Sequence, residues 1–499
     1  MVNRRSLCFS LSGMLWLASL LFAVGPFAQG NETTTAPPVV TPVTITVEPG
    51  ARQSFAGFGA SLGNWGGEYQ WLPTTNRAAL SKMLWHDLNF KILRLWFNTF
   101  QFRPLPGAHD LSQFRKCYVD SGLIADAKKC GVTTLLLAPD GVPEDMKEKR
   151  PDGGVQFKAG QEENYAVLLA DFIKQLKNET GVLLDVTGVQ NEPNDIERFS
   201  PAQLVAVVKD LRRELDARGL PSVRIIATEN ANVDGGFYDQ IDALKNDPAA
   251  WSVLAGVASH SYNMAATDDI ARRLAATDGR NLKEYWMTEA SDNGPETPGD
   301  VLRAASLATR FLNDMNHRVT HWIHFIGFEV ADPNDNATRI IAFNLQPPRV
   351  TVFTKYYYYQ QLARAFDVGA IFRASRSSLD GEMCWSFGQK SRVTAAAAQN
   401  PDGSWSLGLC NFTADSFDAV KNWGDAKWNR EQGGFTPGQT FAVTVKVPEL
   451  KERGKIAFTV HRSDATRKNA GDGNASMHDG EITLRIAPLE LVTLRSAIP

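Results

Sequence analysis

The stretch from Val186 to Asn194 reads Val-Thr-Gly-Val-Gln-Asn-Glu-Pro-Asn. β-Branched residues in its first half favour a strand, and Pro193 cannot continue a helix. Glu192 therefore lies where a strand ends and a loop begins. In a parallel sheet or barrel, ligands bind at this end of the strands. The stretch thus predicts a parallel α/β architecture with an acidic side chain at its ligand-binding edge.

A second glutamate occupies the same kind of position further along the chain. The segment from Glu284 to Ser291 reads Glu-Tyr-Trp-Met-Thr-Glu-Ala-Ser, a short apolar and aromatic run that delivers Glu289 at its end. Hydrolysis of a glycosidic acetal needs a proton for the leaving oxygen and an electron-rich group to meet the oxocarbenium-like carbon. Two carboxyl groups supply both roles. The pair Glu192 and Glu289 therefore indicates glycosidase chemistry, which needs no cofactor.

Strand-like and helix-like pieces alternate around these two segments. The expected strands are 55–61, 91–97, 133–138, 186–194, 224–228, 256–260, 284–288 and 320–326. Helical segments separate them, and the clearest carries apolar residues at helical spacing, namely Tyr165, Leu168, Leu169, Phe172, Ile173 and Leu176. Eight strand-helix units predict a (β/α)₈ barrel, which we place at residues 52–367.

The pattern changes after about residue 368. Short alternating segments follow, separated by Asn, Asp, Gly and Pro, at 392–398, 405–412, 441–447, 456–462 and 482–486. This pattern is typical of an antiparallel β-sandwich. The early strand 43–47 has a Thr-rich alternation that does not suit a barrel, so we assign residues 42–51 and 368–499 to this second domain.

The first residues have the pattern of a secretory signal peptide. Arg4 and Arg5 precede an apolar run at 14–24, and small residues follow near Gly30. We therefore expect residues 1–30 to be a signal peptide, 31–41 to be a disordered lead-in, and the chain to be secreted or held in the periplasm or cell envelope. A retained N-terminal anchor is the alternative. The apolar run is short for a membrane span, so no transmembrane segment is expected in the mature chain.

The overall charge argues against a nucleic-acid partner. The 499 residues carry 52 basic and 55 acidic side chains, a formal net charge of −3, and no block of like charges. Such a chain has no field that gathers nucleic acid. The sequence does not indicate an oligomeric state.

Cysteines and histidines leave some alternatives open. Cys117 with Cys130, and Cys384 with Cys410, are local pairs that either form disulfides or remain buried thiols. Three histidines have a spacing that suggests a metal site, namely His317, His321 and His324. On a strand, however, the last two point to opposite faces, and the first belongs to the preceding helix. We therefore expect no metal, and the third of them remains a candidate for substrate contact.

Several motifs together resemble glycoside hydrolase family 30, within the clan of retaining β-glycosidases. The matching segments are Gly57-Phe58-Gly59-Ala60-Ser61, Met146-Lys147, Gln190-Asn191-Glu192-Pro193, His260-Ser261-Tyr262, Trp286-Met287-Thr288-Glu289-Ala290 and Tyr356 to Tyr359. They follow the order of the family's motifs, from about residue 45 to the C-terminus. The resemblance implies a (β/α)₈ barrel with a β-sandwich and hydrolysis of a β-linked sugar.

The resemblance also implies roles for single residues. Glu192 would be the general acid/base and Glu289 the nucleophile. Asn191 would hold the sugar hydroxyl next to the anomeric carbon, and Tyr262 could donate to the nucleophile. Arg94, at the end of the second strand, is a candidate cation beside it, and a structural Arg paired inside the barrel is the alternative. His260 belongs to the substrate-binding candidates.

Two departures from the family pattern bear on the substrate. Asp140 stands where glucosylceramidase-like members carry a Trp, and Phe325 stands where a Trp often closes the eighth strand. A polar oligosaccharide or polysaccharide is therefore expected rather than glucosylceramide, and Asp140 is a candidate for a sugar hydroxyl. Xylan, β-1,6-glucan and β-1,6-galactan are the leading substrates. Four tryptophans near strand ends are candidate sugar platforms or core residues: Trp65, Trp71, Trp96 and Trp322.

Two other functions remain open at this point. One is a carbohydrate-binding protein with this fold and no turnover. The other is a transglycosylase or xylosidase-type member of the same clan. The residues that would decide between endo and exo action lie in loops, whose shapes the sequence does not define.

Overall fold

The structure is a computed structural model that describes residues 40–62, 68–98, 102, 111–193, 197–262, 266–274, 282–379, 392–414 and 438–498. The expected signal peptide, Trp65 and Cys384 lie outside these residues. Among the helices described, none combines the length and the apolar character that crossing a membrane requires.

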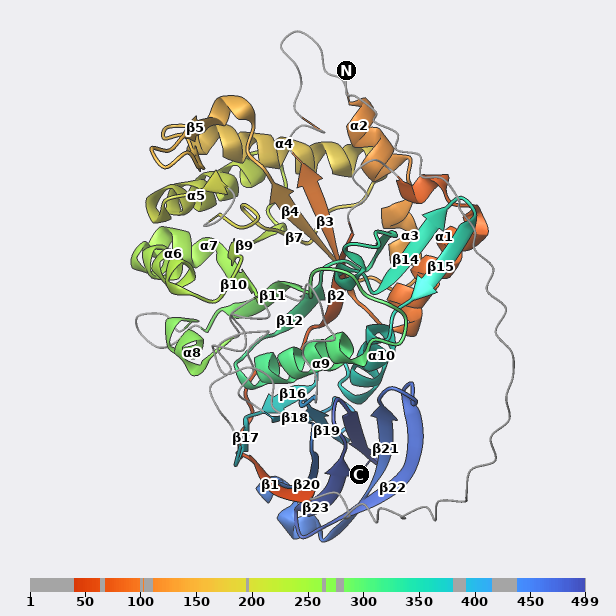
Figure 1. Cartoon of the computed structure of the whole chain (residues 1–499). Coiled ribbons are helices and arrows are strands. Elements are labelled where there is room, and N and C mark those ends of the chain that lie inside the picture. Colours follow the sequence, from red (N-terminus) through yellow and green to blue (C-terminus); the bar gives the residue numbers. More distant parts are fainter. Residues whose placement is uncertain are drawn as a thin grey trace, which may run out of the picture. The chain divides into compact units, whose positions relative to one another are not determined.

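Eight parallel strands close into a barrel (Figure 1), which confirms the predicted (β/α)₈ fold. The strands, in order around the barrel, are β10 (Leu254–His260), β11 (Glu284–Ala290), β12 (His321–His324), β2 (Gly57–Leu62), β3 (Ile92–Asn98), β4 (Thr134–Asp140), β7 (Val186–Thr187) and β9 (Arg224–Asn230). β7 is much shorter than the predicted strand 186–194. Beyond it the backbone still bonds to both neighbours, from Asn191 N to Pro139 O at 2.7 Å and from Glu192 N to Glu229 O at 3.0 Å.

The interior of the barrel is filled by one apolar layer. It contains Ile92, Leu136, Val186, Ile226, Ala258, Trp286 and Ile323. Because side chains alternate along a strand, the residue two positions after Ile92 also points inward, one layer nearer the carboxyl edge. That residue is Arg94. Gly59 allows the close packing of β2 on β3, since a Cβ there would stand 2.5 Å from Ile92 O.

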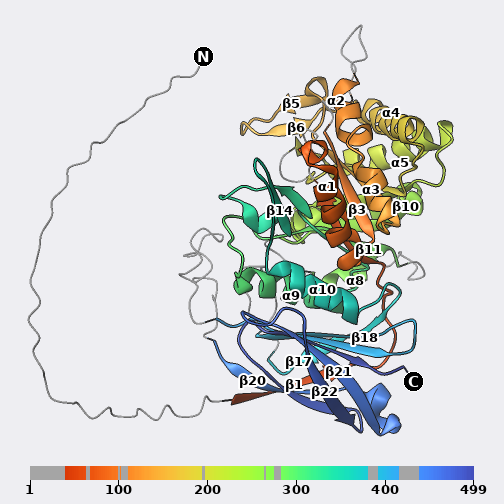
Figure 2. The ribbon, with the colours of Figure 1, turned by 90° about the vertical axis from the view of Figure 1, so that its right-hand side faces the viewer.

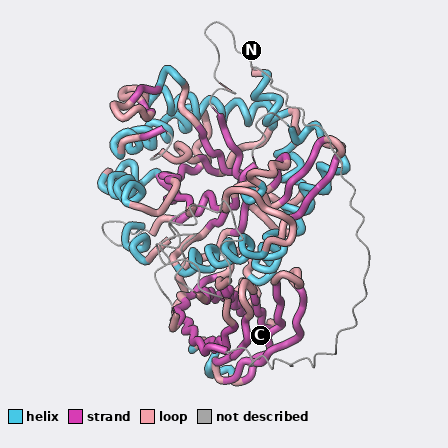
Figure 3. Tube along the Cα trace, in the orientation of Figure 1, coloured by secondary structure: helices cyan, strands magenta, loops and turns pink. Residues whose placement is uncertain are grey.

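Helices surround the barrel strands, as Figure 3 shows. They are α1 (Thr74–Ser81), α2 (Ser112–Phe114), α3 (Leu123–Lys129), α4 (Glu162–Thr180), α5 (Pro201–Ala217), α6 (Gly235–Asn246), α7 (Pro248–Val253), α8 (Asp268–Leu274), α9 (Val301–Asn316) and α10 (Lys355–Ala365). Local sequence explains where α5 begins: Ser200 accepts from Gln203 N, and the Gln203 side chain accepts from Ser200 N, a complete capping box ahead of Pro201.

Two small sheets were not predicted. One contains β5 (Lys147–Lys149), β6 (Val155–Phe157) and β8 (Glu197–Arg198), and the other β13 (Phe328–Val330), β14 (Ile341–Leu345) and β15 (Pro348–Val352). Each strand is short and part of a loop between barrel units, so its periodicity is too brief to read.

The C-terminal part forms a ten-stranded sheet that includes the first strand of the described chain (Figure 2). Its strands, in order of pairing, are β16 (Ile371–Arg373), β18 (Val393–Gln399), β19 (Trp405–Asn411), β24 (Leu491–Ser496), β21 (Lys455–Ser463), β22 (Ala470–His478), β23 (Glu481–Ile486), β20 (Thr440–Lys446), β1 (Val40–Val47) and β17 (Ser375–Ser377). The pairing is antiparallel throughout, as predicted for a sandwich, except that β1 runs parallel to β20. Its own apolar core includes Ile45, Phe441 and Phe458.

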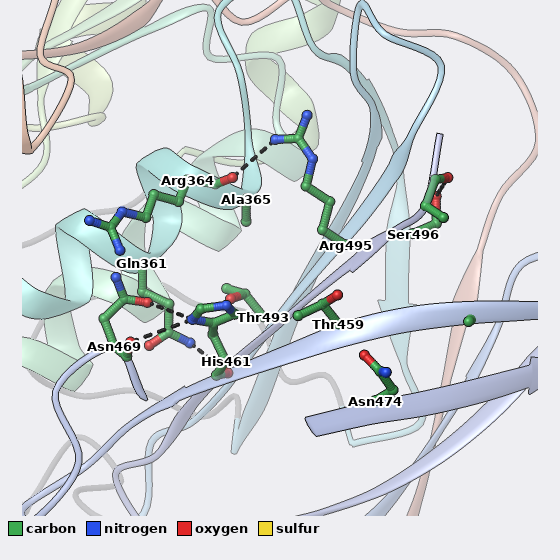
Figure 4. A pocket seen from close by; sticks show the side chains of 12 residues that line it. Gln361, Arg364, Ala365, Thr459, His461, Asn469, Asn474, Thr493, Arg495 and Ser496 are labelled. Carbon is green, nitrogen blue, oxygen red and sulfur yellow. Dashed lines mark hydrogen bonds between the residues drawn. The ribbon is translucent and has the colours of Figure 1, made fainter. Parts of the chain in front are cut away.

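Polar contacts join α10 to this sheet. Gln361 Nε2 donates to His461 O at 2.9 Å and to Leu491 O at 3.1 Å. Arg495 binds Asp367 next to the end of the helix. A cavity of about 460 Å³ lies between these elements (Figure 4), and its lining is mostly polar and small side chains together with the imidazole of His461. It lies far along the chain from Glu192 and Glu289 and contains neither of them.

The described cysteines are free thiols. Cys117 and Cys410 are buried, and Cys130 is half-buried. The local bridge between Cys117 and Cys130 is therefore not formed. Burial raises the pKa of the Cys117 thiol to about 11, so this side chain behaves as a small core residue.

Candidate active site

Glu192 and Glu289 lie at the same edge of the barrel, at the carboxyl ends of the strands. Glu192 follows β7 and Glu289 is the sixth residue of β11. One oxygen from each of them and one nitrogen of His260 all lie within 4.8 Å of one another. Glu289 is 3% exposed, whereas Glu192 is only half-buried. The two carboxyl groups therefore face a common space, with the half-buried one nearer to solvent.

The backbone at Glu192 has an unusual conformation. Its φ angle is +47°, in the left-handed region that non-glycine residues rarely adopt. The hydrogen bond from its amide to Glu229 O holds it there at 3.0 Å. Such conformations concentrate at functional sites, because the surrounding structure must compensate for their cost. The strand-ending Glu-Pro pair thus turns the Glu192 side chain into the barrel mouth.

Three side chains contact the carboxylate of Glu289. Tyr262 donates its hydroxyl to Oε1 at 2.9 Å, and Arg94 Nη1 donates to Oε2 at 3.2 Å. His260 Nε2 also lies 3.2 Å from Oε2. Burial raises the pKa of Glu289, and His260, Arg94 and Tyr262 oppose that shift by favouring the charged form. The site therefore holds a buried carboxylate whose neighbours favour its ionised form.

His260 lies between the two glutamates. Its Nδ1 is 3.0 Å from Glu192 Oε1, while Nε2 faces Glu289. Burial lowers the pKa of His260 to about 4, so the imidazole is neutral near pH 7. A neutral imidazole donates from one nitrogen and accepts at the other. The ring is fully buried and contacts the glutamates, so its place differs from the substrate-binding role expected from the sequence.

Arg94 lies beneath the site and is also fully buried. Besides Glu289, it donates from Nη2 to Asn191 Oδ1 at 3.0 Å and to Glu229 Oε1 at 3.1 Å. Burial lowers the pKa of Arg94, but Glu229 and Glu289 outweigh this effect and raise it. Both alternatives from the sequence therefore hold in part: Arg94 is a paired structural cation and also the cation beside Glu289. It does not reach substrate directly.

Glu229 is the residue that sequence analysis missed. It follows the predicted strand 224–228 and ends a β-branched run, just as Glu192 and Glu289 end theirs. This shared position was the sequence feature from which Glu229 could have been identified. Its side chain is fully buried against Arg94.

Trp96, Phe325 and Asp140 lie near the carboxyl edge of the barrel. The centre of the Trp96 ring lies 4.6 Å from the guanidinium carbon of Arg94 and 5.7 Å from the centre of the Phe325 ring, which it meets edge-on. Trp96 is only 6% exposed. Asp140 ends β4 and is paired in register with Asn98, so it lies at the same carboxyl edge as the glutamates.

Trp322 and His324 lie on the face of β12 that points away from the barrel interior. Trp322 is fully buried and donates its Nε1 to Asp314 Oδ2 at 2.9 Å. His324 is fully buried as well, with its ring nitrogens 2.8 Å from Tyr359 Oη and 2.9 Å from Thr338 O. The structure therefore does not bring these two candidates to the side of the barrel where Glu192 and Glu289 lie. Alternation along the strand turns Ile323 into the barrel and these two toward the helices.

Arginines from α9 hold the loop after β11. Arg310 donates to Ser291 O at 3.0 Å and to Asp292 Oδ1 at 3.1 Å. Arg303 donates to Asn293 O at 2.9 Å and to Pro295 O at 3.0 Å. Because these contacts bind the backbone just beyond Glu289, they restrict how far its strand end can move.

Within the residues that the structure describes, one cluster of side chains has the composition of a metal site, and it is the active-site cluster of Glu192, His260 and Glu289. Arg94 already neutralises Glu289, and a cation beside it would be repelled. The histidines considered above do not form one site. His321 stacks on Trp286 inside the barrel, with the ring centroids 3.4 Å apart, whereas His324 lies outside the barrel.

No family profile and no curated protein sequence matches this sequence. Solved structures with the same fold do match. The chain is similar to the catalytic domain of the family 30 xylanase C from Talaromyces cellulolyticus, with a TM-score of 0.65 and 16% identity over 91% of this chain and 100% of that one. It is similar to a family 30 endoxylanase from Clostridium papyrosolvens, with a TM-score of 0.62 and 17% identity over 91% and 100%. An endo-β1,6-glucanase matches with a TM-score of 0.61 and 17% identity over 91% and 94%. The chain therefore has the barrel-and-sandwich fold of family 30 glycoside hydrolases.

Proposed function

We propose that this protein is a secreted retaining β-glycoside hydrolase that cleaves a β-linked oligosaccharide or polysaccharide. Glu289 is the nucleophile and Glu192 the general acid/base. The observation that carries the proposal is the approach of the two carboxyl groups to within 4.8 Å, at the carboxyl edge of the barrel. Retaining glycosidases separate their carboxyl groups by about 5 to 5.5 Å, whereas inverting ones leave room for a water between them at about 6.5 to 9.5 Å.

In the first step, an oxygen of Glu289 attacks the anomeric carbon and forms a glycosyl ester. The bond to the leaving oxygen breaks, and Glu192 gives that oxygen its proton. The attacking carboxylate must be ionised, which Arg94 and Tyr262 favour. The acid must hold a proton, and the neighbouring negative charge of Glu289 favours a protonated carboxyl group there.

In the second step, Glu192 takes a proton from water, and the resulting hydroxide oxygen attacks the same carbon. The ester bond to Glu289 breaks, and the sugar leaves with its original anomeric configuration. Asn191 binds Arg94 through its Oδ1, which orients the amide so that its nitrogen can donate to the sugar hydroxyl beside the reacting carbon.

A polar sugar chain is the proposed substrate. Asp140 at the carboxyl edge supplies an acceptor for sugar hydroxyls, and Phe325 with Trp96 supplies a smaller aromatic surface than a Trp pair would. Xylan, β-1,6-glucan and β-1,6-galactan remain the leading substrates. Assays on these three polysaccharides and on matching aryl glycosides identify the sugar.

The stereochemistry of the product tests the mechanism. We expect proton NMR of a reaction with an active aryl β-glycoside to show the β-anomer first, followed by slow mutarotation. The α-anomer as first product would reject the two-step route. In the presence of a sugar acceptor, a dominant new glycoside instead of free sugar would favour a transglycosylase.

Replacing Tyr262 by Phe tests the hydrogen bond to the nucleophile. We expect kcat/KM to fall by about tenfold to a hundredfold, the usual effect of losing a hydrogen bond to a charged group. The hydroxyl lowers the pKa of Glu289, so its removal raises that pKa. The acid limb of the pH profile, below which Glu289 is protonated, should therefore move to higher pH. An unchanged acid limb would contradict this role of Tyr262.

A further inference from the structure

A third acidic side chain lies beside the proposed catalytic pair and has no part in the two chemical steps. Glu229 is the sixth of the seven residues of β9, so it lies near the carboxyl end of its strand, as Glu289 does in β11. Its side chain is fully buried beneath the site, out of reach of a substrate. Burying a carboxylate is costly unless it is paired, so a specific partner must justify its presence.

That partner is Arg94, which Glu229 shares with the nucleophile. Arg94 Nε and Nη2 lie 3.3 Å and 3.1 Å from Glu229 Oε1, and Nη1 lies 3.2 Å from Glu289 Oε2. The guanidinium is planar, so fixing one side fixes the direction of the other. Glu229 thus determines where Arg94 meets Glu289.

The carboxylate of Glu229 packs closely against the backbone at Gly188. Its Oε2 is buried and makes no hydrogen bond to any described group. A Cβ at Gly188 would stand 1.8 Å from this oxygen, so the space exists only because residue 188 is glycine. Gly188 lies in the segment that leads to Glu192, four residues later. The sequence around the acid/base is therefore adapted to the third carboxylate.

Glu229 also contacts the acid/base through its backbone. The carbonyl of Glu229 accepts from Glu192 N at 3.0 Å, and both residues have positive φ angles, +61° and +47°. One residue thus supports both glutamates, the nucleophile through Arg94 and the acid/base through its amide.

Electrostatics give this arrangement a consequence. One guanidinium charge faces two carboxylates, so the negative charge of Glu229 offsets part of the stabilisation that Arg94 gives to ionised Glu289. We propose that Glu229 is a positioning residue that aligns Arg94 with the nucleophile and limits how strongly Arg94 favours the ionised form of Glu289. The proposal rests on the proposed function, because it assigns Glu289 as the nucleophile.

Replacing Glu229 by Gln tests the proposal, because the variant keeps the shape and removes the charge. Without the negative charge of Glu229, the attraction between Arg94 and ionised Glu289 is no longer offset. The protonation of Glu289 should therefore shift to lower pH by about one pH unit. The acid limb of kcat/KM moves with it. Because the alignment of Arg94 is weakened, kcat falls by about tenfold or more while KM changes little.

The protonation of Glu289 can be followed without turnover. Glutamate labelled with ¹³C at the side-chain carboxyl gives a signal that titrates, and the signal missing from Glu289→Gln identifies the nucleophile. An unchanged titration midpoint in Glu229→Gln would overturn the proposal, whatever the activity. If the wild-type chain hydrolyses no glycoside but the midpoint still shifts, the proposed function fails and the electrostatic coupling stands.

Gly188→Ala is the second variant and guards against a Gln variant that does not fold. It pushes the Glu229 carboxylate away from Arg94 without changing any charge, so we expect a fall in kcat and a shift of the midpoint in the same direction. Gly235→Ala on α6 is the matched control, since a Cβ there meets nothing within 4 Å. Wild-type kcat and midpoint in Gly188→Ala would also overturn the proposal.

Discussion

Replacing Glu289 by Gln should reduce hydrolysis by about 10⁴-fold or more, the range seen when a catalytic nucleophile is lost. The amide has the shape of the carboxylate and still meets Tyr262 and Arg94, but it cannot form the glycosyl ester. Arg94 remains paired with Glu229, so the buried cation keeps a counter-charge and the barrel should fold. Release of the aryl group from an active aryl β-glycoside measures the loss.

The same variant separates an enzyme from a carbohydrate-binding protein. Affinity for the polysaccharide, measured by calorimetry, should persist in Glu289→Gln because the walls of the site are unchanged. If the wild-type protein binds the sugar chain and neither protein hydrolyses it, the binding function is correct and the catalytic one is wrong. A melting temperature close to that of the wild type shows that lost activity is not lost folding.

Replacing Glu192 by Ala should give the second largest effect, and one that depends on the leaving group. Polysaccharide hydrolysis should fall by about 10² to 10⁴-fold, the contribution of general acid and base catalysis. Acidic phenols leave an aryl glycoside without needing a proton, so the first step should continue on such substrates. The glycosyl ester should then accumulate, and the phenol should be released in a burst. The half-buried position of Glu192 means that its truncation opens space beside the ester.

Azide provides the positive control for this variant. It is a nucleophile that needs no general base, so it should enter the space left by Glu192, speed turnover and yield a β-glycosyl azide. Formation of the α-azide, or equal losses on all leaving groups, would contradict the assignment of Glu192 as the acid/base.

Local sequence predicted the parts of the fold that depend on local signals. Short apolar runs ended by glutamates placed Glu192 and Glu289 at one edge, because in a parallel barrel every strand ends at the same side. Helical spacing predicted α4 from the apolar stripe between Tyr165 and Leu176. These signals are contained in a few neighbouring residues, so a single sequence carries them.

Long-range pairing determined what the sequence did not predict. Which face of β12 points inward depends on the register with β11 and β2, and this register turns Trp322 and His324 away from the barrel interior. Glu229 lies near the end of its strand, yet only its contact with Arg94, 135 positions earlier, shows its place in the site. The separation of Cys117 and Cys130 as free thiols is likewise a property of the folded chain.

The insertion of β1 between β20 and β17 has a consequence for synthesis on the ribosome. Thr41 bonds to Gln439, 398 positions later, so the pairing of β1 with β20 must wait until most of the polypeptide has emerged. Closing so long a loop is slow, and an unpaired β-rich edge invites association with other nascent chains in the meantime. The barrel can fold first, whereas the sheet cannot be completed until its last strands have been synthesised. Folding of the C-terminal strands is therefore the step that completes this molecule.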